Sequence, residues 1–399
     1  MNLTTQEILG HRLRVHHLEG KLPKEQLLQA TGVCGMQNSP PGAWETAMFQ
    51  RLKGCTMEDL HQALYREKSL LQAWSYRGVP VVFPTAERDI YLKALIPQPG
   101  EEPWIYTNGI GLALDFLHLS FQELLPLVQQ AASCLDTCII QSKEQLDQVL
   151  AQQVEKLLPP KFQSLWNAPS MYGRPDRQTV GGAAVSFLLR PCSFLGLVVF
   201  GERQGTHPTF TSMKHWIGET EGGTPEPEKE LTKKFLHAYG PTTPKDFESW
   251  LGAGPQQAKR LWKLLEEEIT PVLVEGKTRF LLTQDLENLA PPSQDSLLLL
   301  GPHDPYLDLR DRNLILEEKS LQRQVWQTVS NPGVVLKGGK ILGIWRGKTV
   351  KKKLQLSLTL WQPTTQREKE NLQDLAEEYA NFRNLQLTAL QFQETESSF

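Results

Sequence analysis

The amino-acid sequence predicts an α+β protein made of tandem winged-helix (helix-turn-helix plus wing) domains and a C-terminal β-rich domain. Three patterns predict this fold class. Residues 228–290 follow the order helix, turn, helix, turn, helix and two-stranded hairpin. Residues 120–213 repeat that order as a pattern, without residue-level identity. Beyond Ser296, apolar runs separated by turns favour a sheet.

Residues 228–290 give the clearest of these units. Helices are expected at 228–239, from Thr243 to 251, and at 256–267, where apolar residues recur at helical spacing. Glycine and proline mark the turns at 240–242 and 252–255. Strands at 272–274 and 280–282, joined by a turn at 275–277, form the wing. This layout indicates binding to double-stranded DNA.

Five helix starts carry the spacing of a capping box, in which a hydroxyl and a polar side chain three residues later bind the first free amides. The pairs are Thr4 with Glu7, Thr56 with Asp59, Ser120 with Glu123, Ser142 with Gln145 and Thr243 with Asp246. Helices are therefore expected at 4–18, 56–67, 120–134 and 142–158. Further helices are expected at 23–32, 41–52, 180–189 and 366–382, and strands at 79–83, 197–200, 209–213, 334–336, 341–345 and 354–360.

The same patterns divide the chain into five segments. An N-terminal winged-helix-like domain is expected at 1–100, a second winged-helix domain at 101–217, an acidic linker at 218–227, a third winged-helix domain at 228–290 and the β-rich domain with its terminal helix at 291–399. A chain of 399 residues is long enough for several domains of this size.

Charge is segregated along the chain. The formal net charge of −3 argues against a protein that coats nucleic acid through a global positive field. Residues 319–367 nevertheless contain ten Lys or Arg and no Asp or Glu, while the linker at 218–227 is acidic. Any DNA-binding surface is therefore expected to be local.

Cysteine usage and hydropathy set the expected compartment. Five cysteines, with no CxxC pair and no zinc-finger spacing, predict a reduced, cytoplasmic protein without a bound metal. Residues 1–20 lack the apolar core of a secretory signal, and the most apolar stretch, 183–200, is interrupted by Arg190 and Pro191. We expect a monomer with no membrane association, no cofactor and no obligate protein partner.

The sharpest local signal is the segment 35–42, with the sequence GMQNSPPG. A residue before proline is pushed into an extended conformation, and residues two apart on an extended backbone share a face. Gln37 and Ser39 would then project together, with Asn38 opposite, so that a carboxamide and a hydroxyl could bind a water molecule or a base edge. The alternative is a loop that ends one helix and starts the next.

Four motifs of this chain resemble the AlkZ/YcaQ family of bacterial DNA glycosylases, which are winged-helix proteins. The motifs are GMQNS at 35–39, WSYRGVP at 74–80, PHDPYLDLRDR at 302–312, and NPGVV at 331–335 followed by GIWR at 343–346. The resemblance implies a tandem winged-helix fold, removal of alkylated purines and unhooking of interstrand crosslinks. It covers nearly the whole chain.

In that family the catalytic motif is Gln-x-Gln or Gln-x-Asp. Gln37 matches its first member, and Ser39 stands where the second belongs. A serine hydroxyl is short and is not a base near neutral pH. Glu45 and Asp304 are therefore candidates for supplying the missing negative charge, against the alternatives of a first-turn helix residue for Glu45 and a turn residue for Asp304.

A basic tract provides the candidate DNA contacts. Phosphate contacts by cationic side chains on strands and turns would give salt-dependent affinity, although lysines also protect solvated edge strands. The candidates are Arg346, Lys348, Lys351, Lys352 and Lys353, with Asn38 and Arg77 elsewhere in the chain.

Three functional hypotheses follow. The first is a monofunctional DNA glycosylase that hydrolyses the N-glycosidic bond of alkylated purines or interstrand crosslinks, with Gln37 and Ser39 catalytic. The second is a non-catalytic winged-helix DNA-binding or regulatory protein in which Ser39 marks the loss of the catalytic motif. The third is a scaffold for protein partners, with negligible affinity for DNA even at low salt.

Overall fold

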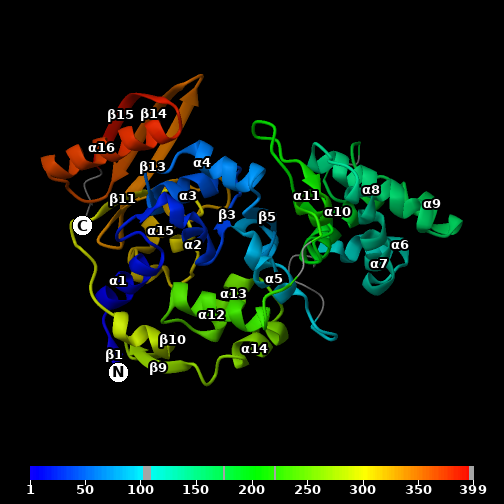
Figure 1. Ribbon diagram of the computed structural model, residues 1–399, viewed down its shortest axis with the longest axis horizontal. Coiled ribbons are helices and arrows are strands. Elements are labelled where there is room, and N and C mark those ends of the chain that lie inside the picture. Colours follow the sequence, from blue (N-terminus) through cyan, green and yellow to red (C-terminus); the bar gives the residue numbers. More distant parts are fainter. Residues whose placement is uncertain (102–108, 174–175, 220–221, 395–399) are drawn as a thin grey trace. The chain divides into compact units, whose positions relative to one another are not determined.

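The computed structural model describes residues 1–101, 109–173, 176–219 and 222–394 (Figure 1). The chain is a mixed helix and sheet protein that separates into two compact units. Unit 1 comprises Met1–Ala63, Thr232–Phe247 and Leu265–Phe399, and unit 2 comprises Leu64–Leu231 and Glu248–Leu264. The five sequence-based segments remain a prediction, and residues 220–221 of the expected linker lie outside the described residues.

Unit 1 is organised around a sheet whose described strands run in the order β11 (Leu297–Leu300), β12 (Gly333–Lys337), β13 (Lys340–Val350), β14 (Lys353–Leu360) and β15 (Gln386–Glu394). Neighbours pair antiparallel from β11 to β14, while β14 and β15 pair in parallel. The three strands expected between 334 and 360 are confirmed, and β15 is an addition to them.

Both faces of this sheet are buried. Leu298 and Leu300 of β11 pack in one apolar cluster, while Leu297 and Leu299 pack in another. Successive side chains of a strand point to opposite faces, so a run of four leucines is suited to a strand that is covered on both sides. Helix α1 (Thr5–Val15) contributes Leu9 and Leu13 to the first cluster.

Helix α16 (Gln366–Phe382) covers the other face of the sheet (Figure 1). Its buried residues Leu372, Ala376 and Ala380 lie four apart and therefore on one side of the helix. Thr365 and Glu368 form a complete capping box at its start. The expected terminal helix at 366–382 is confirmed.

The N-terminal part of unit 1 contains α2 (Leu27–Gly32), β3 (Met36–Gln37), α3 (Ala43–Arg51) and α4 (Met57–His61), with the short strands β2 (Leu22–Pro23) and β4 (Leu52–Lys53) paired in parallel. The boxes expected at Thr4 and Thr56 are both complete. The helix expected at 56–67 is shorter than predicted, because α4 ends at His61 and the chain continues as a π-helical turn.

Residues 227–282 follow the expected element order. Helices α12 (Pro227–Tyr239), α13 (Pro244–Leu251) and α14 (Pro255–Lys263) precede the hairpin of β9 (Ile269–Val274) and β10 (Lys277–Leu282). Sequence alone did not indicate that β1 (Asn2–Leu3) pairs in parallel with β9. One edge of this hairpin is therefore covered by the start of the chain.

Unit 2 has a mostly helical core. Its helices are α5 (Arg88–Tyr91), α6 (Gly111–Leu117), α7 (Phe121–Ala132), α8 (Lys143–Leu157), α9 (Pro160–Trp166), α10 (Val180–Phe194) and α11 (Met213–Ile217), and its strands pair as β5 (Leu70–Trp74) with β6 (Pro80–Pro84) and β7 (Val199–Phe200) with β8 (Phe210–Thr211). Trp74, Phe200 and Phe210 pack together with side chains of α7, α8 and α10.

No single described helix is long and apolar enough to cross a bilayer. One bent pair, Gly111–Leu117 with Phe121–Asp136, reaches the required length and composition only when its two helices are taken together.

Within unit 1, side chains of α1 hold the C-terminal end of α12. The carbonyl oxygens of residues 237–241 would otherwise lack helical partners. Nε2 of His11 and Nε2 of His16 each lie 3.1 Å from one of these oxygens, and the Arg12 guanidinium donates to three more at 2.8–3.4 Å. Arg12 also pairs with Asp311 at 2.7 Å, so its buried charge is neutralised.

These contacts require a proton on Nε2 of each histidine, and burial disfavours a second proton on the ring, which makes the fold sensitive to acid. Burial lowers the pKa of His11 from its ordinary value of 6.5 to about 4. Between pH 6.5 and 4, His11 binds a proton in the unfolded chain but not in the folded one. Its contribution to the free energy of unfolding is therefore fully present above pH 6.5 and is lost as the pH falls toward 4. We expect the free energy of unfolding to drop by about 3 kcal/mol across this window.

Urea unfolding at pH 7.5 and pH 4.5 measures this dependence. His11→Gln is the matched variant, because glutamine keeps a donor for the carbonyl oxygen but does not titrate. It should reduce the pH dependence, while buried His16, whose pKa is also lowered, accounts for part of what remains. An unchanged dependence in His11→Gln would contradict the assignment to His11.

Candidate functional site

The segment 35–42 forms a hydrogen-bonded turn between β3 and α3. Nε2 of Gln37 donates to the backbone carbonyl of Ser39 at 3.1 Å. Oδ1 of Asn38 accepts from the amide of Gly42 at 2.7 Å, and Gly42 has a φ of 98°, a left-handed conformation that glycine adopts readily. The chain is extended at Gln37 as expected, but it bends at Ser39 and Pro40, where an extended backbone was expected, and the Asn38–Gly42 hydrogen bond closes the bend.

Exposure differs along this turn. The side chain of Asn38 is 4% exposed and serves the turn itself, while Gln37 keeps 8% of its surface exposed and Ser39 is half-buried. Ser39 contributes its main-chain oxygen to Gln37, so the pairing of the two residues involves one side chain and one backbone group rather than two side chains.

Glu45 lies directly behind this turn, in the first turn of α3. Its carboxylate is fully buried, and Oε1 lies 3.4 Å from Nε2 of His61. A side chain at Gly42 would place its first carbon 3.8 Å from Oε2 of Glu45. The carboxylate therefore lies close to the backbone of Gly42, the last residue of the turn.

Asp304 is engaged by a buried ion pair instead. Both of its carboxylate oxygens accept from the Arg51 guanidinium at 2.8 Å, and neither side chain is exposed. Oδ1 also accepts from the amide of Tyr306 at 3.0 Å. Asp304 thus joins α3 to the 302–312 tract, and its charge is already balanced by Arg51.

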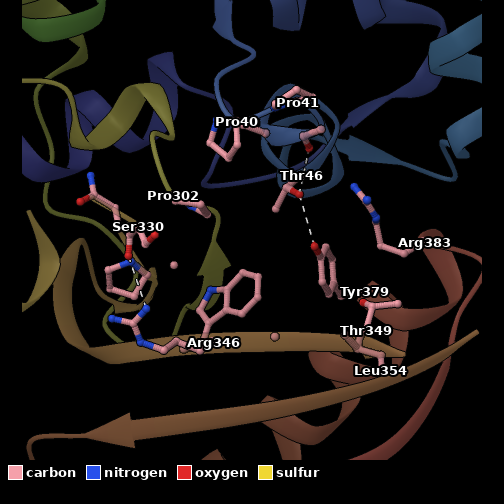
Figure 2. Close-up of a pocket in the computed structure, with 17 residues that line it drawn as sticks. Pro40, Pro41, Thr46, Pro302, Ser330, Arg346, Thr349, Leu354, Tyr379 and Arg383 are labelled. Atoms are coloured by element: carbon pink, nitrogen blue, oxygen red, sulfur yellow. Dashed lines mark hydrogen bonds between the residues drawn. The ribbon is translucent and has the colours of Figure 1, made fainter. Parts of the chain in front are cut away.

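A cavity of about 320 Å³ begins where this turn ends (Figure 2). One wall is formed by Pro40, Pro41 and Gly42, and another by β13, including Arg346. Helix α16 contributes Tyr379, whose hydroxyl lies 3.3 Å from Oγ1 of Thr46. The remaining lining comes from Ala43, Pro302, Ser330, Asn331, Pro332, Gly333, Trp345, Gly347, Thr349, Leu354 and Arg383.

The expected basic residues are divided between this cavity and the hairpin of β13 and β14. Arg346 lines the cavity and donates to the carbonyl of Ser330 at 3.4 Å (Figure 2). Lys348 is exposed on the outer half of β13. The last three lysines, Lys351, Lys352 and Lys353, are exposed at the hairpin tip and line a second hollow with residues 381 and 384–386.

Arg77 lies in unit 2 and is half-buried. Its guanidinium stands 4.9 Å from the ring centre of Tyr76, which itself stacks on Trp250 at 4.3 Å. Nη1 of Arg77 donates to the carbonyl of Trp250 at 3.4 Å. Its packing within unit 2 is thus defined, while its proposed contact with DNA remains a prediction.

Among the residues that the structure describes, no group of three or more His, Cys, Asp or Glu side chains is arranged to hold a metal ion. All five cysteines are free thiols. Burial raises the pKa of Cys34, which precedes the turn, to about 12, so its thiolate is not available near neutral pH.

A family model described as "DNA glycosylase AlkZ-like" matches residues 30–382. The chain belongs to the AlkZ-like DNA glycosylase family. The match includes the turn, the lining strand β13 and all of α16. The family expected from the four sequence motifs is confirmed, and with it the DNA glycosylase function.

Two comparisons with AlkZ-like proteins extend over nearly the whole chain. A curated relative from Streptomyces sahachiroi, named an interstrand DNA cross-link repair glycosylase, is 23% identical over 359 residues, which is 86% of this chain and 88% of that protein. The solved structure of S. sahachiroi DNA glycosylase AlkZ superposes with a TM-score of 0.76 at 21% identity, covering 99% of this chain and 100% of that one. The structural likeness shows a shared fold.

The cavity lining includes residues that were not expected from the sequence, among them two from the end of α16. Tyr379 and Arg383 lie four residues apart at the end of α16, so they share one side of the helix. The amphipathic pattern of 366–382 predicted the helix, but it did not indicate what the helix would face.

Replacing Asp304 tests whether this residue stabilises the fold by balancing the buried charge of Arg51. Asp304→Asn leaves an unbalanced, fully buried guanidinium and should lower the free energy of unfolding by about 3 kcal/mol. Glu317→Gln is the matched control, because Glu317 pairs with Lys340 at 2.8 Å but is 79% exposed. This control should cost under about 1 kcal/mol. Equal losses in urea unfolding would contradict the structural role of Asp304.

Proposed function

We propose that the protein hydrolyses the N-glycosidic bond of alkylated purines in duplex DNA, including purines joined across an interstrand crosslink. One observation carries the proposal: the turn that contains Gln37, the match to the family's catalytic motif, borders a cavity whose opposite wall comes from the basic hairpin. The reaction would need neither a metal nor a cofactor. The protein would act as a cytoplasmic monomer.

The chemistry suits a carboxamide. An N7-alkylated purine leaves as a neutral base from a cationic precursor, so its departure needs little acid assistance. The protein must position a water molecule and stabilise an oxocarbenium-like sugar. With Nε2 of Gln37 bound to the Ser39 carbonyl, the amide plane is oriented, and Oε1 is the atom that we propose accepts a hydrogen bond from the attacking water.

Negative charge near the sugar is the second requirement. Ser39 has no charge to give, and the charge of Asp304 is balanced by Arg51. We therefore assign this role to Glu45, whose buried carboxylate lies behind Gly42 at the cavity wall. A buried environment of low effective dielectric strengthens its field at the reacting sugar.

DNA binding would involve the basic hairpin of β13 and β14 and the helix-turn-helix elements. We propose that residues 227–282 and the weaker copy in unit 2 are tandem winged helices. The exposed residues Gln256, Lys259 and Lys263 of α14 would face DNA, whereas α10 is mostly buried and does not offer such a face.

Arg346 and the tip lysines 351–353 would contact phosphates, with Lys348 between them. Asn38 would act through the shape of the turn, and Arg77 would add a contact from unit 2.

Base release from a duplex with one N7-methylguanine tests the role of Gln37. Gln37→Ala removes the proposed water-positioning oxygen and should slow release about 100-fold. Gln26→Ala is the matched control, because Gln26 is exposed outside the turn in the same unit. Wild-type protein that binds the duplex but releases no base would favour the non-catalytic hypothesis.

Restoring the family's motif tests the role of position 39. Ser39→Asp places a carboxylate beside Gln37 and should raise the rate of base release about tenfold, equivalent to about 1.4 kcal/mol of transition-state stabilisation. Ser39→Asn, of similar size and without charge, is the control. A rate that rises equally in both variants, or falls in Ser39→Asp, would contradict the need for charge at this position.

A further inference from the structure

The cavity beside the turn has a third wall, formed by α16. Arg383 follows the last residue of α16 and is half-buried, and its side chain faces the cavity (Figure 2). The residue lies one position beyond the segment matched by the family model. Any function of Arg383 therefore has to be argued from its surroundings.

The lining of this cavity is positively charged. It contains two guanidinium groups, Arg346 from β13 and Arg383 just after α16, and no Asp or Glu is among the described lining residues. Arg346 uses Nη1 for one long hydrogen bond of 3.4 Å to the Ser330 carbonyl. Within the described residues Arg383 makes no side-chain hydrogen bond or ion pair. A guanidinium has five N–H donors, so donors remain on both arginines for an anion.

The Arg383 guanidinium lies close to the glycine that ends the turn. The position that a first side-chain carbon would take at Gly42 lies 3.7 Å from Nη1 of Arg383 and 3.8 Å from Oε2 of Glu45. Because Gly42 has no side chain, the guanidinium can lie close to the backbone of the turn. A larger residue at this position would crowd it.

Aromatic groups form the floor between the two arginines. The rings of Trp345 and Tyr379 meet edge to face, with centroids 5.4 Å apart. Nε1 of Trp345 donates to the Leu300 carbonyl at 2.8 Å, so its ring is fixed by the sheet. A rigid aromatic floor flanked by guanidinium groups suits a nucleotide, whose sugar and base contact apolar surface while its phosphate binds arginine.

We propose that this cavity is a subsite for one backbone phosphate of the DNA strand that carries the lesion, with Arg383 and Arg346 binding the phosphate from opposite sides. Arg383 is then a positioning residue that fixes the register of the strand, so that the neighbouring nucleotide lies against Gln37. The cavity volume of about 320 Å³ is at the lower end of the range for ligand sites, consistent with one phosphate and its sugar. The inference rests on the proposed function.

The salt dependence of DNA binding tests this subsite. The probe is a duplex with one tetrahydrofuran abasic analogue, and affinity is measured by fluorescence anisotropy between roughly 50 and 300 mM KCl, where each phosphate contact adds about 0.9 to the slope of log affinity against log salt. Arg383→Gln should reduce the magnitude of the slope by about 0.9. Arg383→Lys keeps the charge and should retain the slope. Arg367→Gln is the matched control, because Arg367 is exposed in the first turn of the same helix.

The slopes of the Arg383 and Arg367 variants decide whether the phosphate subsite exists. An unchanged slope in Arg383→Gln, or an equal reduction in Arg367→Gln, overturns the subsite. Thermal unfolding of all variants accompanies the titrations, and only Arg383→Lys rescue of the slope at equal stability supports a phosphate contact over a structural role.

Base release by the wild-type protein, measured in parallel, separates this inference from the proposed function. Release by the wild type with no effect of Arg383→Gln on the slope rejects the subsite alone. A reduced slope in Arg383→Gln without any release by the wild type rejects the glycosylase chemistry alone.

Discussion

The interaction on which most of unit 1 depends is the contact between α1 and the end of α12. Five carbonyl oxygens at a helix C-terminus are costly to bury, and α1 satisfies them with one charged and two neutral side chains. The same helix packs Leu9 and Leu13 on the sheet and follows β1, which pairs with β9. One short helix therefore fixes the sheet, the end of α12 and the hairpin of β9 and β10 in a single arrangement.

Local features of this fold were predictable from the sequence. The capping boxes at Thr4, Thr56 and Ser120 are complete because each needs only residues three apart. Elements defined by a distant partner were not. Strand β1 is two residues long and exists through β9, and β15 is ordered by parallel pairing with β14. Neither strand has a local turn signal that would distinguish it from an irregular segment.

The candidate site shows the same division between local and distant information. The segment 35–42 was singled out from its residues, but an extended backbone was expected at Ser39, where the chain bends and a hydrogen bond between Asn38 and Gly42 closes the turn. The sequence left both Glu45 and Asp304 as charge candidates. The structure separates them, because Asp304 meets Arg51 across 253 residues of chain. Tyr379 and Arg383 were missed for the same reason.

The separation along the chain has a consequence for biosynthesis. The hydroxyl groups of Thr46 and Tyr379 that meet at the cavity are 333 residues apart. At roughly 5 to 20 residues per second, the ribosome needs about 17 to 70 seconds to make the intervening chain. During that time the turn is already present without its third wall. A nascent or prematurely terminated chain can therefore fold its first helices without gaining the complete cavity, so a truncated product would not retain it.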